Sequence, residues 1–181
     1  LGPDGRLLPF QRVKPEHTFL TTPPWRIRVL TTARLPALGW GVFSVGWVER
    51  ARALTATAGV AARRPGEIAG GRYRVQAKTG GRGIALFHGR RRMLGPDGLG
   101  AITVEDAFGS WGGCYDEPDS RHFTTVRHVW KITAVETLER GPLRAGLWLR
   151  LAGGNSQLDL ILRLSGNRDA IDVEARLLWN E

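Results

Sequence analysis

Alternating leucines near the C-terminal end of the chain predict a β-strand. Leucine occupies every second position from Leu158 to Leu164, and polar residues such as Asp159 and Arg163 stand between them. Successive side chains of a strand point to opposite faces of a sheet, so this spacing places a row of leucines on one face. Residues 171–177 repeat the alternation, and the intervening segment 165–169 is rich in turn-forming residues. The two runs therefore predict a β-hairpin.

Two further strand-like segments, 127–138 and 143–151, precede this hairpin and are joined by the turn Gly141-Pro142. Four consecutive strands with short turns form an antiparallel meander, whose apolar face needs a second sheet or another domain to cover it. The alternation predicts the following core residues on this face: Leu147, Leu149, Leu158, Leu160, Leu162, Leu164, Ile171, Val173, Ala175 and Leu177.

Glycine and proline interrupt the whole chain. The 181 residues include 24 glycines and 10 prolines, and few segments leave room for a helix of about a dozen residues. Segments 25–30 and 40–48 predict additional strands. We therefore expect an all-β fold, an antiparallel β-sandwich preceded by a few strands of a smaller β-domain. The expected boundaries are 1–50 for the end of the small domain, 51–66 for a linker and 67–181 for the large sandwich, truncated at its C-terminus.

The overall composition is that of a soluble globular protein, with 42% hydrophobic and 24% charged residues. No apolar run approaches the ~20 residues that a transmembrane helix needs, and no basic stretch leads into an apolar one near the start. The single cysteine, Cys114, cannot form an internal disulfide, which fits a reducing compartment. We therefore expect a cytoplasmic protein with no membrane partner. Because the chain starts with Leu1 and its last strand-like run stops just before Glu181, we also expect a piece of a longer protein.

The net charge of +9 is unevenly distributed. Residues 1–98 contain 17 Lys and Arg against 5 Asp and Glu, whereas residues 99–181 contain 9 against 12. A basic half can attract nucleic acid through its phosphates. However, most of these arginines alternate with apolar residues, as in 25–29 and 72–75, and alternation places them on the solvent face of a strand. The one continuous run, Arg90-Arg91-Arg92, lies beside a predicted turn, so nucleic-acid binding is the less favoured interpretation.

Glycine, aromatic and acidic residues concentrate in the segment 105–117. Aromatic faces pack against the C–H side of a pyranose, and carboxylates accept hydrogen bonds from its hydroxyls. A glycosidase also needs a pair of carboxylates. The alternative is a sheet-end loop whose aromatics pack under the sandwich and whose carboxylates are solvated. We expect a loop that faces a ligand or another domain rather than a complete active site, with the candidate residues Asp106, Phe108, Trp111, Tyr115 and Asp116.

The histidines are only weak evidence for a metal site. His122 and His128 would face the same side of one continuous strand. Zinc needs three or four protein ligands, and nothing in the sequence fixes Asp116 or Asp119 beside them. We therefore assign no metal ligand and interpret these histidines as surface residues.

Several short stretches follow one another in a recognisable order. They are Asp4-Gly5-Arg6-Leu7-Leu8-Pro9-Phe10-Gln11, Ala33-Arg34-Leu35-Pro36-Ala37-Leu38-Gly39-Trp40, Glu105 to Gly112, Val135 to Ala145, and Ile171-Asp172-Val173 with Trp179-Asn180-Glu181. In this order they resemble the D-G-x-x-v-P-x-Q, v-P-P-L-G-y/w, D-t-W-g, v-x-E-x-G-P-l-R-a and i-D-v…d-W-h-E patterns of the C-terminal β-region of glycoside hydrolase family 38. This is the α-mannosidase family, and its bacterial branch is the nearest. The resemblance covers nearly the whole chain.

The resemblance implies a supersandwich-like, non-catalytic part of a retaining enzyme that hydrolyses α-mannosides. Family members carry zinc, an aspartate nucleophile and an acid/base carboxylate on an N-terminal barrel and helical bundle, and no such motif stands in this sequence. We therefore assign no catalytic residue and no cofactor to this chain, and expect zinc in the absent catalytic domain.

The resemblance also implies partners. The expected ones are the N-terminal catalytic domain of the same parent chain and carbohydrate, and exposed apolar surface predicts a homodimer when that domain is missing. The loop from Asp106 to Asp116 is expected to face the catalytic cleft. It departs from the family pattern at Gly109 and Ser110, because the family has an aspartate before the Thr-Trp pair. We therefore do not assign to this chain any contact that the family makes through that aspartate.

Two other functions stay open. The first is a free-standing carbohydrate-binding sandwich that uses the aromatics of 105–117, in which case Trp111→Ala abolishes glycan affinity. The second is a basic β-domain that binds nucleic acid through its N-terminal half, in which case retention on DNA falls steeply with ionic strength.

Overall fold

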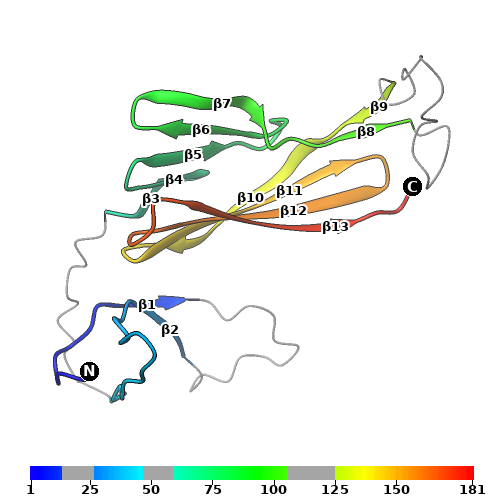
Figure 1. Cartoon of the computed structure of the whole chain (residues 1–181). Coiled ribbons are helices and arrows are strands. Elements are labelled where there is room, and N and C mark those ends of the chain that lie inside the picture. The colour runs from blue at the N-terminus through cyan, green and yellow to red at the C-terminus, as the bar shows by residue number, and fades with distance from the viewer. Residues whose placement is uncertain (14–26, 47–58, 106–124) are drawn as a thin grey trace.

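The computed structural model describes residues 1–13, 27–46, 59–105 and 125–181. Within these ranges the chain forms strands and turns and contains no helix (Figure 1). The strands are β1 (Phe10–Val13), β2 (Arg28–Thr31), β3 (Ala61–Arg64), β4 (Glu67–Gly70), β5 (Tyr73–Ala77), β6 (Ile84–His88), β7 (Arg91–Gly98), β8 (Ile102–Val104), β9 (Val126–Val129), β10 (Lys131–Arg140), β11 (Arg144–Gly153), β12 (Ser156–Ser165) and β13 (Ile171–Leu178).

The last four strands form one antiparallel sheet in the order β10-β11-β12-β13. Leu147 pairs with Leu162, and Leu162 pairs with Val173, so the apolar residues of neighbouring strands share one face. The meander and the C-terminal hairpin predicted from the alternation are confirmed.

A second antiparallel sheet contains five strands in the order β3-β4-β5-β6-β7. Ile68 pairs with Val75, and Val75 pairs with Leu86, which sets an apolar row on the inner face of this sheet. The sheet begins at Ala61, inside the segment 51–66 expected as a linker. The adjacent Val60 is 3% exposed and belongs to the core.

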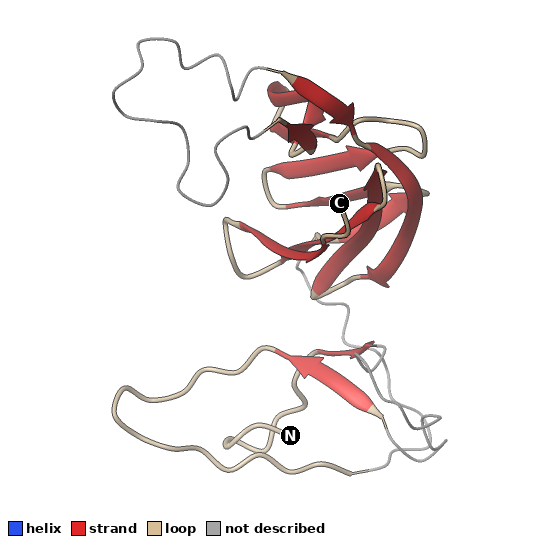
Figure 2. Cartoon of the chain, turned by 90° about the vertical axis from the view of Figure 1, so that its right-hand side faces the viewer, coloured by secondary structure: helices blue, strands red, loops and turns tan. Residues whose placement is uncertain are grey.

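The two sheets pack face to face as an all-β sandwich, the fold class that the sequence predicts (Figures 1 and 2). Strands β3 and β4 lie against β10, β11 and β12. The buried apolar side chains between the sheets form one cluster: Val60, Ile68, Val75, Ile84, Trp130, Ile132, Ala145, Leu147, Leu149, Leu151, Leu160, Leu162 and Leu164. Removing this apolar surface from water is the main contribution to stability.

Part of the predicted core is wrong. Val173 is 49% exposed and Leu177 is 60% exposed, and Ala175 between them is exposed as well. All three face the same side as the buried leucines of β12, as predicted. They stay uncovered because β3 and β4 lie over β10, β11 and β12, and β13 is the outermost strand of its sheet. Leu158 and Ile171 are partly buried at the margin of the core.

The segment 127–138 is divided between two sheets rather than forming the single strand that was expected. Its first part, β9, pairs with β8 in a two-stranded ribbon, and β10 pairs with β11. The change falls at Trp130, which is 2% exposed and donates an indole hydrogen bond to the buried hydroxyl of Thr103 at 2.8 Å. A large side chain that turns into the core ends one ribbon and begins the next.

The N-terminal strands β1 and β2 pair with each other and lie below the sandwich in Figures 1 and 2. The described part of the strand expected at 40–48, residues 40–46, forms no strand. Large apolar side chains of this unit are mostly exposed: Leu35, Leu38, Trp40, Val42 and Val45. Exposed apolar patches of this kind mark contacts with other molecules or domains.

The described residues contain no helix that meets the length and apolarity needed for a membrane span.

The pair Leu162 and Val173 tests where the core ends. Leu162→Ala removes a fully buried side chain and is expected to lower the free energy of unfolding by about 2–5 kcal/mol. Val173→Ala acts at a half-exposed position and is expected to lower it by less than about 1 kcal/mol. Urea denaturation of the two variants measures both values. Equal losses would show that β13 is covered like β12.

Candidate functional site

The five candidate residues of the predicted ligand-facing loop, Asp106, Phe108, Trp111, Tyr115 and Asp116, lie outside the described residues, as does His122. The structure describes the stem from which this segment leaves the sandwich. The stem is the β8–β9 ribbon, in which Thr103 pairs with His128.

Hydrogen bonds hold the two ends of this segment together. The Glu105 amide donates to the carbonyl of Thr125 at 2.9 Å, and Arg127 donates to the Glu105 carboxylate at 2.7 Å. The indole of Trp130 anchors the same ribbon to the core through Thr103. The segment 106–124 therefore starts and ends at one fixed point of the fold.

The C-terminal residues lie at the same end of the sandwich (Figure 1). One carboxylate oxygen of Glu181 accepts hydrogen bonds from the Asn155 amide and the Ser156 hydroxyl, both at 2.9 Å. The Ser156 oxygen in turn accepts from the Asn180 amide at 2.9 Å. The hydrogen bonds from the Ser156 hydroxyl and the Asn155 amide lower the pKa of Glu181. The chain end is thus fixed to the β11–β12 turn.

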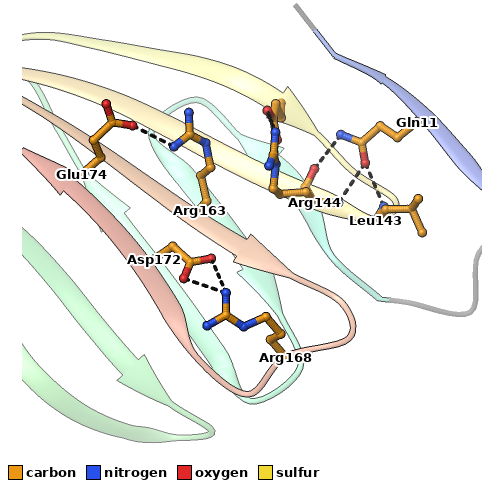
Figure 3. Close-up of polar contacts among 8 residues, drawn as sticks. Gln11, Leu143, Arg144, Arg163, Arg168, Asp172 and Glu174 are labelled. Atoms are coloured by element: carbon orange, nitrogen blue, oxygen red, sulfur yellow. Dashed lines mark hydrogen bonds and ion pairs between the residues drawn. The ribbon is translucent and has the colours of Figure 1, made fainter. Parts of the chain in front are cut away.

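Gln11 connects the N-terminal unit to the sandwich and is only 5% exposed. Its side-chain oxygen accepts hydrogen bonds from the amides of Leu143 and Arg144, each at 2.8 Å, and its side-chain nitrogen donates to the Arg144 carbonyl at 2.8 Å (Figure 3). One glutamine side chain therefore satisfies three main-chain groups at the β10–β11 turn.

A buried ion pair stiffens the same turn. The Arg144 guanidinium donates two parallel hydrogen bonds to the Glu139 carboxylate, at 2.5 and 2.6 Å. The two side chains are 23% and 7% exposed, and this fork geometry is the strongest form of an Arg–carboxylate contact. Gly141 in the turn has φ 95°, and a Cβ there would lie 2.1 Å from the Val60 carbonyl oxygen. Glycine is therefore required at this position.

A cleft of about 610 Å³ opens between β1, the β3–β4 turn and β10. We call it the β10 cleft, because six consecutive β10 residues, 135–140, line it. The β3–β4 turn depends on Gly66, whose φ is 71° and whose Cβ would lie 2.2 Å from the Ala77 carbonyl oxygen. Four arginines line the cleft from these three segments, and we call them the cleft arginines: Arg12, Arg63, Arg64 and Arg140.

The outer face of the β10–β13 sheet carries paired charges. Arg150 donates to both oxygens of Asp159, at 2.8 and 3.0 Å, and lies 5.0 Å from the Trp148 ring centroid. Glu174 accepts from Arg163 at 3.1 Å (Figure 3) and from Arg176 at 2.8 Å. The hydrogen bonds from Arg150 lower the pKa of Asp159, and those from Arg176 and Arg163 lower the pKa of Glu174.

On the outer face of the five-stranded sheet, arginines pack on an aromatic ring instead of pairing with the carboxylates that the structure describes. The guanidinium groups of Arg74 and Arg92 lie 4.0 and 5.3 Å from the centroid of the Phe87 ring. Neither arginine has an ion pair with a carboxylate among the residues described here. Both arginines use the ring for cation–π contact. This sheet carries part of the basic excess of the N-terminal half, since residues 61–98 contain 9 Lys and Arg against 2 Asp and Glu.

Within the described ranges, no group of three or more His, Cys, Asp or Glu residues is placed to hold a metal ion. His128 is exposed on β9. Sequence reasoning missed the Gln11 contact and the β10 cleft. The Gln11 contact joins residues 132 positions apart, and no local pattern reports such a pairing.

We compared the chain with known protein families, curated proteins and solved structures. No family model, curated protein or solved structure matches this chain.

Gln11→Ala tests the connection between the two units. The variant leaves buried main-chain groups at the β10–β11 turn without their partner, and we expect a loss of about 1–3 kcal/mol in the free energy of unfolding. Gln157→Ala, at an exposed position of β12, is the matched control and is expected to change stability by less than about 0.5 kcal/mol. Equal losses in chemical denaturation would contradict the role assigned to Gln11.

The ion pairs on the outer face of the β10–β13 sheet predict that the free energy of unfolding decreases at acid pH. A carboxyl group whose pKa is lowered by folding stabilises the folded state above its ordinary pKa, and that contribution disappears as the pH falls through the folded pKa. Because the pKa values of Asp159 and Glu174 are lowered, stability is expected to decline below about pH 4. Asp159→Asn should be less stable at pH 7 and show a shallower acid decline, whereas Asp97→Asn, at an exposed position of β7, should follow the unmodified chain. Thermal unfolding from pH 7 to pH 2 measures both.

Proposed function

We propose that this chain is the non-catalytic C-terminal β-region of a glycoside hydrolase that resembles the family 38 α-mannosidases. In this proposal it packs on a catalytic domain of the same parent chain and shapes access of α-mannosides to that domain. The observation that carries the proposal is the uncovered stripe on β13, formed by Val173, Ala175 and Leu177. A sheet face of this kind needs a partner surface.

Two of the stretches that resemble the family supply a second argument, because they meet in space. Gln11 closes the first stretch and binds the main chain of Leu143 and Arg144 in a later one. Glu181 ends the last stretch and fixes the chain end to the β11–β12 turn. Residues that carry a family pattern are expected to make contacts on which the architecture depends, and the contacts of Gln11 and Glu181 support the proposal in this sense.

The proposal leaves the chemistry to the catalytic domain. Zinc and the reacting carboxylates belong there, and this chain holds no cofactor. Carbohydrate as the partner, a cytoplasmic location and the cleft-facing role of Asp106, Phe108, Trp111, Tyr115 and Asp116 belong to the same proposal.

Release of an aryl group from an aryl α-mannoside, with zinc present, tests whether catalysis belongs to the catalytic domain and not to the 181-residue chain. The complete parent chain is expected to turn over the substrate, and the 181-residue chain is expected to show no turnover. Turnover by the 181-residue chain would contradict the proposal, as would a parent chain that hydrolyses no α-mannoside.

Two neighbouring leucines test the docking face. Leu177 and Leu178 are 60% and 61% exposed, but they point to opposite faces of β13. In the parent chain, Leu177→Asp places a charge in the proposed interface and is expected to lower the melting temperature and the mannosidase activity. Leu178→Asp is the matched control and should leave both close to the unmodified values. In the 181-residue chain, Leu177→Asp should also reduce dimerisation measured by light scattering. Equal behaviour of the two variants would reject the β13 stripe as an interface.

A further inference from the structure

The β10 cleft has the charge of an anion-binding site. The four cleft arginines are exposed, and none of them forms an ion pair with a carboxylate in the described part of the chain. Two glutamates also line the cleft, Glu136 and Glu139. The Glu139 carboxylate is already engaged by Arg144. The cleft therefore presents a net positive surface made from three separate segments.

The cleft also lies along the outer edge of a strand. Among the strands that the structure describes, β10 is the outermost of its sheet and pairs with β11. At the start of β10, this edge is occupied, because Ile132 exchanges main-chain hydrogen bonds with Gly80 and Gly81, each at 2.7 Å. Further along, six consecutive residues of β10 line the cleft. A free edge offers main-chain donors and acceptors to an added strand.

The lining argues against sugars and nucleobases as occupants. No aromatic residue lines this cleft among the residues that the structure describes. Pyranose rings and bases are held chiefly by stacking on aromatic side chains, which this cleft does not offer. A strand edge flanked by arginines instead matches a peptide whose main chain pairs with β10 and whose carboxylates meet the guanidinium groups.

We propose that an extended acidic peptide segment binds in the β10 cleft as an additional strand on β10, with its carboxylates paired to the cleft arginines. This inference does not depend on the proposed function, because it uses only the cleft, its charge and the strand edge.

The probe is a capped hexapeptide of alternating glutamate and valine, titrated into the 181-residue chain and followed by calorimetry. We expect saturable binding that weakens with added salt. The same peptide with lysine in place of glutamate is expected not to bind. Failure of the glutamate peptide to bind, or equal binding of the lysine peptide, would overturn the inference.

Substitutions identify the site. Arg64→Ala is expected to weaken binding by about fivefold, and Arg12→Ala with Arg64→Ala by more than about tenfold. Arg90→Ala, at an exposed turn outside the cleft, is the matched control and should leave the affinity within about twofold. All three positions are exposed, so the variants are expected to fold. An affinity that is insensitive to the cleft arginines would place the peptide elsewhere and overturn the proposal.

Main-chain pairing has its own test. Alternate amides of an added strand point toward β10, so methylation of the valine nitrogens and methylation of the glutamate nitrogens should have unequal effects. Equal effects would show that charge alone holds the peptide. A sulfated polysaccharide or single-stranded DNA that binds the cleft arginines when the peptide does not would contradict the choice of a peptide.

Discussion

The cover that β3 and β4 provide over β10, β11 and β12 is the constraint on which the rest of the structure depends. The leucines of β11 and β12 form a large part of the buried apolar cluster, and a sheet face of this kind is stable only when another layer lies on it. The five-stranded sheet supplies that layer for three of the four strands. Where the cover ends, at β13, the same alternation produces an exposed apolar stripe instead of a core.

Polar contacts then fix the parts that apolar packing does not reach. Gln11 attaches β1 to the β10–β11 turn, and the Arg144–Glu139 pair stiffens that turn. At the opposite end, Glu181 is bound to the β11–β12 turn. Each contact joins segments that are distant in sequence or closes a hairpin. The resulting frame defines the β10 cleft on one side of the sandwich and the stem of the segment 106–124 on another.

The sequence predicts the strands better than it predicts what packs against them. The alternation of apolar residues correctly predicts the last three strands and the buried face of β12, because it reports which side of a strand is apolar. It reports nothing about what covers that side, so Val173, Ala175 and Leu177 were wrongly expected to be buried. It also missed the break at Trp130, where a buried indole ends one ribbon. The predicted ligand-facing residues, such as Trp111, lie outside the described residues, so their role stays a prediction.

The central claim is the proposal that another domain of a longer parent chain completes the apolar face of β13. Hydrogen exchange of the β13 amides, compared between the 181-residue chain and the complete parent, tests this claim most directly. We expect the β12 amides to exchange slowly in both and the β13 amides to be protected far more strongly in the parent, because a covered strand opens less often. Equal protection of β13 in the two proteins would contradict the claim.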